Sequence, residues 1–129
     1  MSVADYFNSA KGTGVLATSS ASGEVDAALY ARPHVMDEQT VAFIMADRLS
    51  HRNLQSNPNA IYLFMERGEG YKGKRLYLTK IAEETDPQKI KALRRRPLPD
   101  ECGVDSESRF LVHFRVDRVR PLVGDDPEA

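Results

Sequence analysis

The chain has 129 residues, of which 41% are hydrophobic and 29% are charged, and its formal net charge is −1. This length and composition predict one globular domain with a single hydrophobic core and argue against a disordered chain. The nearly balanced charge gives no general attraction to nucleic acid or to an anionic membrane, so any anion site must be local.

The first predicted element is a short helix, for which Ser2 is a candidate N-cap and which Gly12 and Gly14 end. Six β-rich runs follow, over residues 14–18, 25–31, 40–46, 60–65, 76–81 and 110–119. Residues 19–23 supply small side chains and a glycine between the first two runs, and residues 36–39 separate the second run from the third. Because parallel strands need long crossovers, these short connections predict a mainly β, six-stranded antiparallel domain.

Two of these runs carry informative patterns. The last run alternates, which predicts that Phe110, Val112, Phe114 and Val116 are buried while Leu111, His113, Arg115 and Asp117 face water. Residues 60–65 are apolar on both faces, which predicts a strand covered by the barrel interior on one side and by a helix or a partner subunit on the other.

Two further helices are predicted between the strands. One begins near Ser50, and the other begins near Asp86 and Pro87 and ends in an arginine run at residues 94–96 that suits its negative C-terminal dipole. Residues 97–108 and the acidic residues 124–129 are predicted to lack regular structure. The sequence therefore predicts one domain over residues 1–123 and a disordered tail.

The segment with the clearest chemical signal is residues 46–58, between the third and fourth strands. Ser50 can cap the helix predicted there, and its N-terminus would present unpaired backbone N–H groups beside Arg48, His51 and Arg52. This arrangement attracts a phosphate group. The alternative is an ordinary surface helix that binds nothing.

Two other clusters are candidate parts of a site. Lys74 and Arg75 belong to a basic, glycine-rich segment that opens the fifth strand, and the alternative for it is a solvated hairpin. Residues 30–34 end the second strand, where Pro33 marks a strand edge or bulge and leaves backbone groups available to a planar ligand. Leu29, Tyr30 and Met45 are candidates to cover the faces of that ligand.

Several classes of site are disfavoured. His34, His51 and His113 lie in separate elements without metal-ligand spacing, and no serine has the sequence context of a hydrolytic triad. A dinucleotide-binding glycine fingerprint is absent. Cys102, the only cysteine, has acidic neighbours and cannot form an intrachain disulfide; with no signal peptide or membrane-spanning run, this predicts a cytoplasmic protein.

Taken in order, the segments GVLATSS, ARPH, TVAFIMAD, RLSHRNLQSNP and IYLF resemble the FMN-binding split-barrel family related to pyridoxamine 5'-phosphate oxidase. The resemblance spans roughly residues 12–82, and GYKGKRLYLTKI and FLVHFRVDRV are similar to the closing strands of that family. Its most diagnostic part is a Ser-x-x-Asn-Leu-x-x-Asn-Pro pattern that begins at Ser50 and ends at Pro58.

The resemblance implies a six-stranded antiparallel Greek-key split barrel that forms a homodimer, with one FMN at each subunit interface and a small-molecule electron donor or acceptor. It also implies a set of cofactor-binding residues from the strand edge, the phosphate helix and the fifth strand. These are Tyr30, Ala31, Arg32, Pro33, Ala46, Arg48, Ser50, His51, Asn53, Lys74 and Arg75.

The chain departs from the family pattern in two places. Many members have a phosphate-binding lysine where this chain has Ser50, and the C-terminal arginine and histidine motif of true pyridoxamine 5'-phosphate oxidases has no counterpart. The resemblance therefore implies an FMN-dependent oxidoreductase of unknown substrate and not that specific activity. The alternatives are a non-catalytic flavin-binding or electron-transfer protein and a barrel that holds haem or a deazaflavin.

Overall fold

The computed structural model describes residues 2–93 and 109–124, which form three helices and seven strands. The helices are α1 (Val3–Ser9), α2 (Leu49–Ser56) and α3 (Pro87–Leu93). The strands are β1 (Gly12–Ser19), β2 (Val25–Leu29), β3 (His34–Val35), β4 (Thr40–Ala46), β5 (Asn59–Glu66), β6 (Gly73–Glu84) and β7 (Arg109–Pro121). No helix among these residues is long and apolar enough to cross a membrane.

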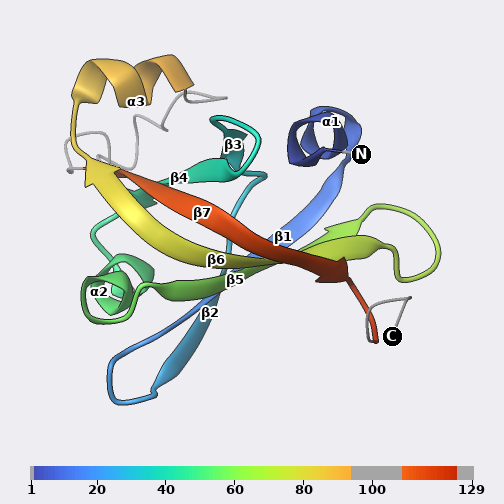
Figure 1. Ribbon diagram of the computed structural model, residues 1–129, viewed down its shortest axis with the longest axis horizontal. Helices are drawn as coiled ribbons and strands as arrows, with labels where there is room; N and C mark the ends of the chain where they lie inside the picture. The colour runs from blue at the N-terminus through green and yellow to red at the C-terminus, as the bar shows by residue number, and fades with distance from the viewer. Residues whose placement is uncertain (1, 94–108, 125–129) are drawn as a thin grey trace, which may run out of the picture.

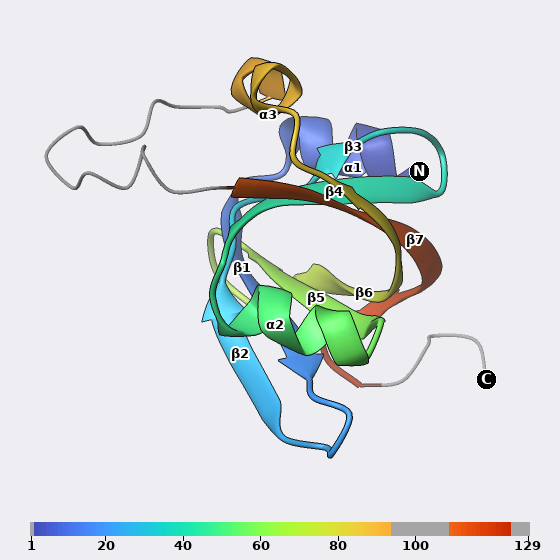
Figure 2. The same ribbon diagram turned by 90° about the vertical axis from the view of Figure 1, so that its left-hand side faces the viewer.

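The strands form one antiparallel sheet in the order β2-β1-β5-β6-β7-β4-β3. Figure 2 shows that this sheet curves round on itself, while α1 and α2 lie on opposite sides of the molecule in both ribbon views (Figures 1 and 2). The prediction of a mainly β, antiparallel fold is confirmed. The count of six strands was one too low, because the two-residue strand β3 is too short to leave a sequence pattern.

The turn predicted at residues 36–39 is present but joins different strands. It closes the hairpin of β3 and β4, where the Met36 N–H donates to the carbonyl of Thr40 at 2.8 Å. β2 pairs only with β1, at one edge of the sheet. The residues between β2 and β3 therefore carry the chain from one edge of the sheet to the other, and the antiparallel pairing of the second and third predicted runs is wrong.

The main core lies inside the curved sheet and is rich in aromatic rings. Tyr62, Phe64 and Phe114 are fully buried there. Helix α1 closes one side by inserting Phe7, whose ring meets Phe64 edge-on at 5.3 Å between centroids. Ser2 caps α1 as predicted, because its hydroxyl accepts a hydrogen bond from the Asp5 N–H at 3.0 Å.

The start of β7 is buried on both faces, which corrects the prediction that one face is wet. Val112 packs into the main core, and Leu111 packs on the other face with Ile90 of α3. His113 also lies on that face, where its Nε2 is 2.6 Å from a carboxylate oxygen of Glu84. The alternation in the sequence could not reveal that α3 folds back over this face.

Helix α3 begins as predicted, since Asp86 Oδ1 accepts a hydrogen bond from the Gln88 N–H at 3.0 Å. The arginine run at residues 94–96, the segment 97–108 with Cys102, and residues 125–129 of the predicted tail lie outside the described residues.

Candidate functional site at the N-terminus of α2

Helix α2 starts one residue earlier than predicted, and Ser50 is not its cap. Arg48 is the N-cap residue, and its side chain makes no capping hydrogen bond. Ser50 fails as a cap because it lies inside the first turn with its side chain buried against the sheet. The first-turn N–H groups therefore lack a capping side chain at the N-cap position, and this is the feature that favours an anion.

The structure brings Ser50 and Arg48 close to Tyr30, which follows β2. Burial raises the pKa of Tyr30, while the Ser50 side chain and the Arg48 charge act in the opposite direction. Two hydrogen bonds hold the backbone of Tyr30 in place. Its N–H donates to the Gly14 carbonyl at 3.0 Å, and its carbonyl accepts from the Tyr62 hydroxyl at 3.1 Å. Three predicted site residues from two distant segments thus meet at one place.

His51 is buried beneath the helix start, with only 6% of its surface exposed. Its ring stacks on Phe110 with 3.8 Å between centroids, and its Nε2 lies 3.2 Å from both carboxylate oxygens of Glu83. Its Nδ1 is buried without a hydrogen-bond partner, and Asp47 Oδ1 is 3.8 Å away, just before the helix. One buried polar atom of the imidazole is therefore unsatisfied.

The side chain of Asn53 is used in a hydrogen bond within the protein. Its Nδ2 donates to Thr18 Oγ1 of β1 at 3.1 Å, and both side chains are buried. At the far end of the helix, Ser56 Oγ accepts from the Ala21 N–H at 3.2 Å. These two contacts hold α2 along β1 and the β1–β2 turn.

Three predicted cationic site residues lie away from α2. Arg32 donates from Nη1 to the carbonyls of Phe7 and Ala10, at 2.8 and 3.0 Å, at the C-terminal end of α1. Lys74 Nζ lies 4.9 Å from the ring centre of Tyr6. Arg75 donates to the carbonyls of Pro121 and Gly124.

The position of Lys74 on β6 sets its distance from the helix. Glu83, which contacts His51, is nine residues further along this strand, which corresponds to about 30 Å of extended chain. A single subunit therefore does not bring Lys74 and Arg75 to the start of α2. Among the remaining predicted residues, Ala46 ends β4 and accepts from the Arg48 N–H at 2.9 Å, Ala31 is exposed, and Pro33 is fully buried.

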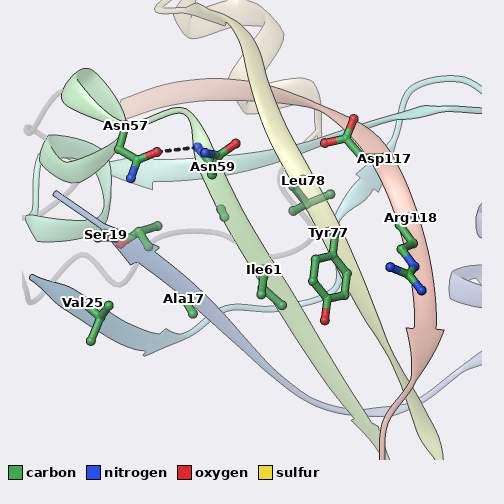
Figure 3. A pocket seen from close by; sticks show the side chains of 12 residues that line it. Ala17, Ser19, Val25, Asn57, Asn59, Ile61, Tyr77, Leu78, Asp117 and Arg118 are labelled. Carbon is green, nitrogen blue, oxygen red and sulfur yellow. Dashed lines mark hydrogen bonds between the residues drawn. The ribbon is translucent and has the colours of Figure 1, made fainter. Parts of the chain in front are cut away.

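A separate apolar groove of about 630 Å³ lies on the outer face of β1, β5, β6 and β7. Figure 3 shows Ile61 and Tyr77 near its middle, Val25 and Ala17 towards one side, and Asp117 and Arg118 on the other. It reaches α2 only at Asn57, beyond the end of the helix, and none of the predicted cofactor residues lines it. The helix start and the groove are thus distinct features of one subunit.

Sequence reasoning missed two kinds of residue. Glu83 and Thr18 contact α2 from strands that are distant in the sequence, so no local pattern marks them. The groove did leave a signal, because β1 and β5 carry small or apolar residues such as Ala17 and Ile61 at outward positions. The prediction of a strand covered on both faces, over residues 60–65, uses only the β5 part of this signal.

The search of family models found no match to this chain, and no curated protein matches it. Solved structures do match. HupZ from Group A Streptococcus is 18% identical with a TM-score of 0.70, and the match covers 97% of this chain and 94% of that one. An FMN-binding protein from Syntrophomonas wolfei is 14% identical with a TM-score of 0.65 over 93% and 83% of the two chains.

A third structure is a protein from Clostridium acetobutylicum related to general stress protein 26, of the pyridoxinephosphate oxidase family. It is 13% identical with a TM-score of 0.63, and the match covers 92% of this chain and 83% of that one. At these identities the likeness shows a shared fold, and this chain has the fold of these three proteins.

Proposed function

We propose that this protein binds FMN, as a homodimer with one flavin at each subunit interface, and acts as a redox flavoprotein. The sheet would then be the six-stranded Greek-key split barrel of the pyridoxamine 5'-phosphate oxidase-related proteins, with β3 as an addition. The observation that carries the proposal is the uncapped start of α2 beside the buried, unpaired Nδ1 of His51. The fold shared with an FMN-binding protein supports it.

The residues at the helix start fit a phosphate monoester. Free N–H groups of the first turn and the exposed Arg48 supply donors and positive charge where many relatives use a lysine, and the unpaired Nδ1 of His51 lies beside them. Tyr30, held in place by Gly14 and Tyr62, would border the flavin ring. When bound, FMN supplies the electron-transfer chemistry, while the protein orients it and keeps water out.

The apolar outer face supports the dimer. On the edge strand β2, Val25 and Leu29 are 82% and 73% exposed, and the groove lined by Ile61 and Tyr77 adjoins them. Exposed apolar area of this extent, next to an unpaired sheet edge, is typical of an interface. A second copy of the chain is the occupant that we propose for this face.

The first experiment is the absorption spectrum of the purified protein, before and after addition of FMN. We expect flavin bands that persist through gel filtration, and FMN should raise the melting temperature. A protein that stays colourless and shows no shift in melting temperature with excess FMN would remove the proposal. A haem or deazaflavin spectrum would show that the protein binds that cofactor and not FMN.

The phosphate site is tested by comparing FMN with riboflavin, which lacks the phosphate. Arg48→Ala should weaken FMN binding by about 1.5–3 kcal/mol, the value of a charge-assisted hydrogen bond, and leave riboflavin binding unchanged. Arg67→Ala removes an exposed cation on the β5–β6 turn and serves as the matched control. Equal effects of the two substitutions on FMN would show that the phosphate binds elsewhere.

The dimer is tested by sedimentation of Leu29→Glu, which places a charge on the proposed interface. Because Leu29 is exposed in the subunit, we expect monomers that keep their melting cooperativity. Tyr71→Glu, at a position 78% exposed on the β5–β6 turn, should stay dimeric.

Steady-state reduction by NADH or NADPH then separates an oxidoreductase from a non-catalytic electron-transfer protein.

A further inference from the structure

The protonation of His51 follows from its neighbours. The Gln55 amide nitrogen donates to the backbone carbonyl of His51 at 3.1 Å and to Glu83 Oε1 at 3.2 Å, which uses both of its hydrogens. It therefore has no hydrogen left for His51 Nε2, although that atom is also 3.1 Å away. Nε2 must carry its own hydrogen and donate it to Glu83.

Glu83 is held as a carboxylate. Burial alone would raise its pKa, but hydrogen bonds from Lys80, Gln55 and His51 outweigh that effect and lower the pKa to about 2. Lys80 Nζ lies 2.7 Å from Glu83 Oε1. A permanent acceptor therefore faces Nε2, and in the neutral ring the remaining nitrogen, Nδ1, carries a lone pair and no hydrogen.

A lone pair at Nδ1 is the wrong partner for an anion at the helix start, because both groups are acceptors. We infer that His51 takes up a proton when a phosphate group docks at the N-terminus of α2, so that its imidazolium donates from Nε2 to Glu83 and from Nδ1 to the phosphate. The inference rests on the proposed function. It makes this site selective for a dianionic phosphate monoester over neutral ligands of the same size.

Charged groups from several elements surround His51. The ring is buried and stacked on Phe110 of β7, and Glu83 on β6 is already paired with Lys80. Asp47, before α2, is 3.8 Å from Nδ1, outside hydrogen-bond distance, and it also lies 3.9 Å from Nε of Arg52. Arg48, at the N-cap, is the charged residue at the start of the helix itself.

The test is calorimetry of FMN binding at pH 8 in buffers with different ionisation enthalpies, which reports the number of protons taken up. Free FMN is a dianion at this pH, so the proton goes either to the protein or to the bound phosphate, and the substitutions below tell the two apart. We expect about one proton per FMN and none with riboflavin, and FMN affinity should fall by up to about tenfold for each unit by which the pH is raised. Tight FMN binding without proton uptake would overturn the inference and leave the proposed function standing.

Two substitutions assign the proton to His51. His51→Asn keeps a nitrogen donor near the position of Nδ1 that needs no proton, so FMN should bind with no uptake and with little dependence on pH. His51→Gln places its nitrogen near the position of Nε2, so Glu83 keeps a donor while FMN binding weakens at least about tenfold, as expected for a lost charge-assisted hydrogen bond. Full proton uptake in either variant would overturn the inference. No binding of FMN or riboflavin by the wild type would remove the proposed function and this inference with it.

Discussion

Helices α1 and α2 are both short and lie on opposite sides of the curved sheet (Figures 1 and 2), yet their ends are treated differently. In α1 the first turn is capped by Ser2, and two carbonyls at the C-terminal end accept from Arg32. In α2 the first turn has no side-chain cap and lies above an unpaired nitrogen of His51. Helix α1, with both ends satisfied, closes one side of the core, whereas α2, with one open end, carries the proposed site.

The largest effect is expected from Phe7→Ala, which removes the α1 side chain that packs into the core. Phe7 is 4% exposed and packs on Phe64 and Tyr62, so the free energy of unfolding should fall by about 3–5 kcal/mol. Urea denaturation measures the loss. At temperatures where the variant stays folded, its FMN affinity should equal that of the wild type, and a large loss of affinity would mean that α1 also contributes to the site.

A smaller effect is expected from Glu83→Gln, which weakens the support of α2. The pKa of Glu83 is lowered from 4.5 to about 2 in the folded protein, so its contribution to stability is complete above about pH 4.5 and is lost as the pH falls to about 2. At neutral pH the variant should lose about 1.5 kcal/mol, the lower value for a hydrogen bond to a charged group. Denaturation curves should converge at low pH, and a constant difference across that range would contradict this account.

The smallest effect is expected from Ser2→Ala, which removes the cap of α1. The hydrogen bond from the Asp5 N–H is exposed, so the loss should be about 0.5–1 kcal/mol. Adding a cap to α2 should have the opposite effect on stability. Arg48→Asp should stabilise the protein without ligand, and it should abolish FMN binding. Thermal melting with and without FMN measures both effects.

Elements with local signals were predicted well. The Ser2 cap, the start of α3 beside Asp86 and the six longer strands all follow from patterns within a few residues. The errors come from contacts between distant segments. Ser50 has the residue type of a cap, but burial beside Tyr30, twenty residues earlier, removes it from that role.

The candidate site shows the same limit. The sequence indicated the helix and the residues on it, because Arg48 and His51 lie within one turn of its start. It could not reveal that Glu83 would fix one nitrogen of His51 and leave the other unpaired, since that depends on how far β6 extends past the bulge near Lys80. For the same reason the sequence placed Lys74 and Arg75 in one site with α2, although these residues lie far from that helix within one subunit.

Gly14 has a consequence for anyone who wishes to redesign this protein. A Cβ built there would lie 1.9 Å from the Tyr62 hydroxyl, the group that holds the Tyr30 carbonyl. Even alanine would push apart three strands at the corner that carries Tyr30. A change of ligand preference should therefore be sought by varying the Tyr30 side chain, while the backbone junction behind it is left as it is.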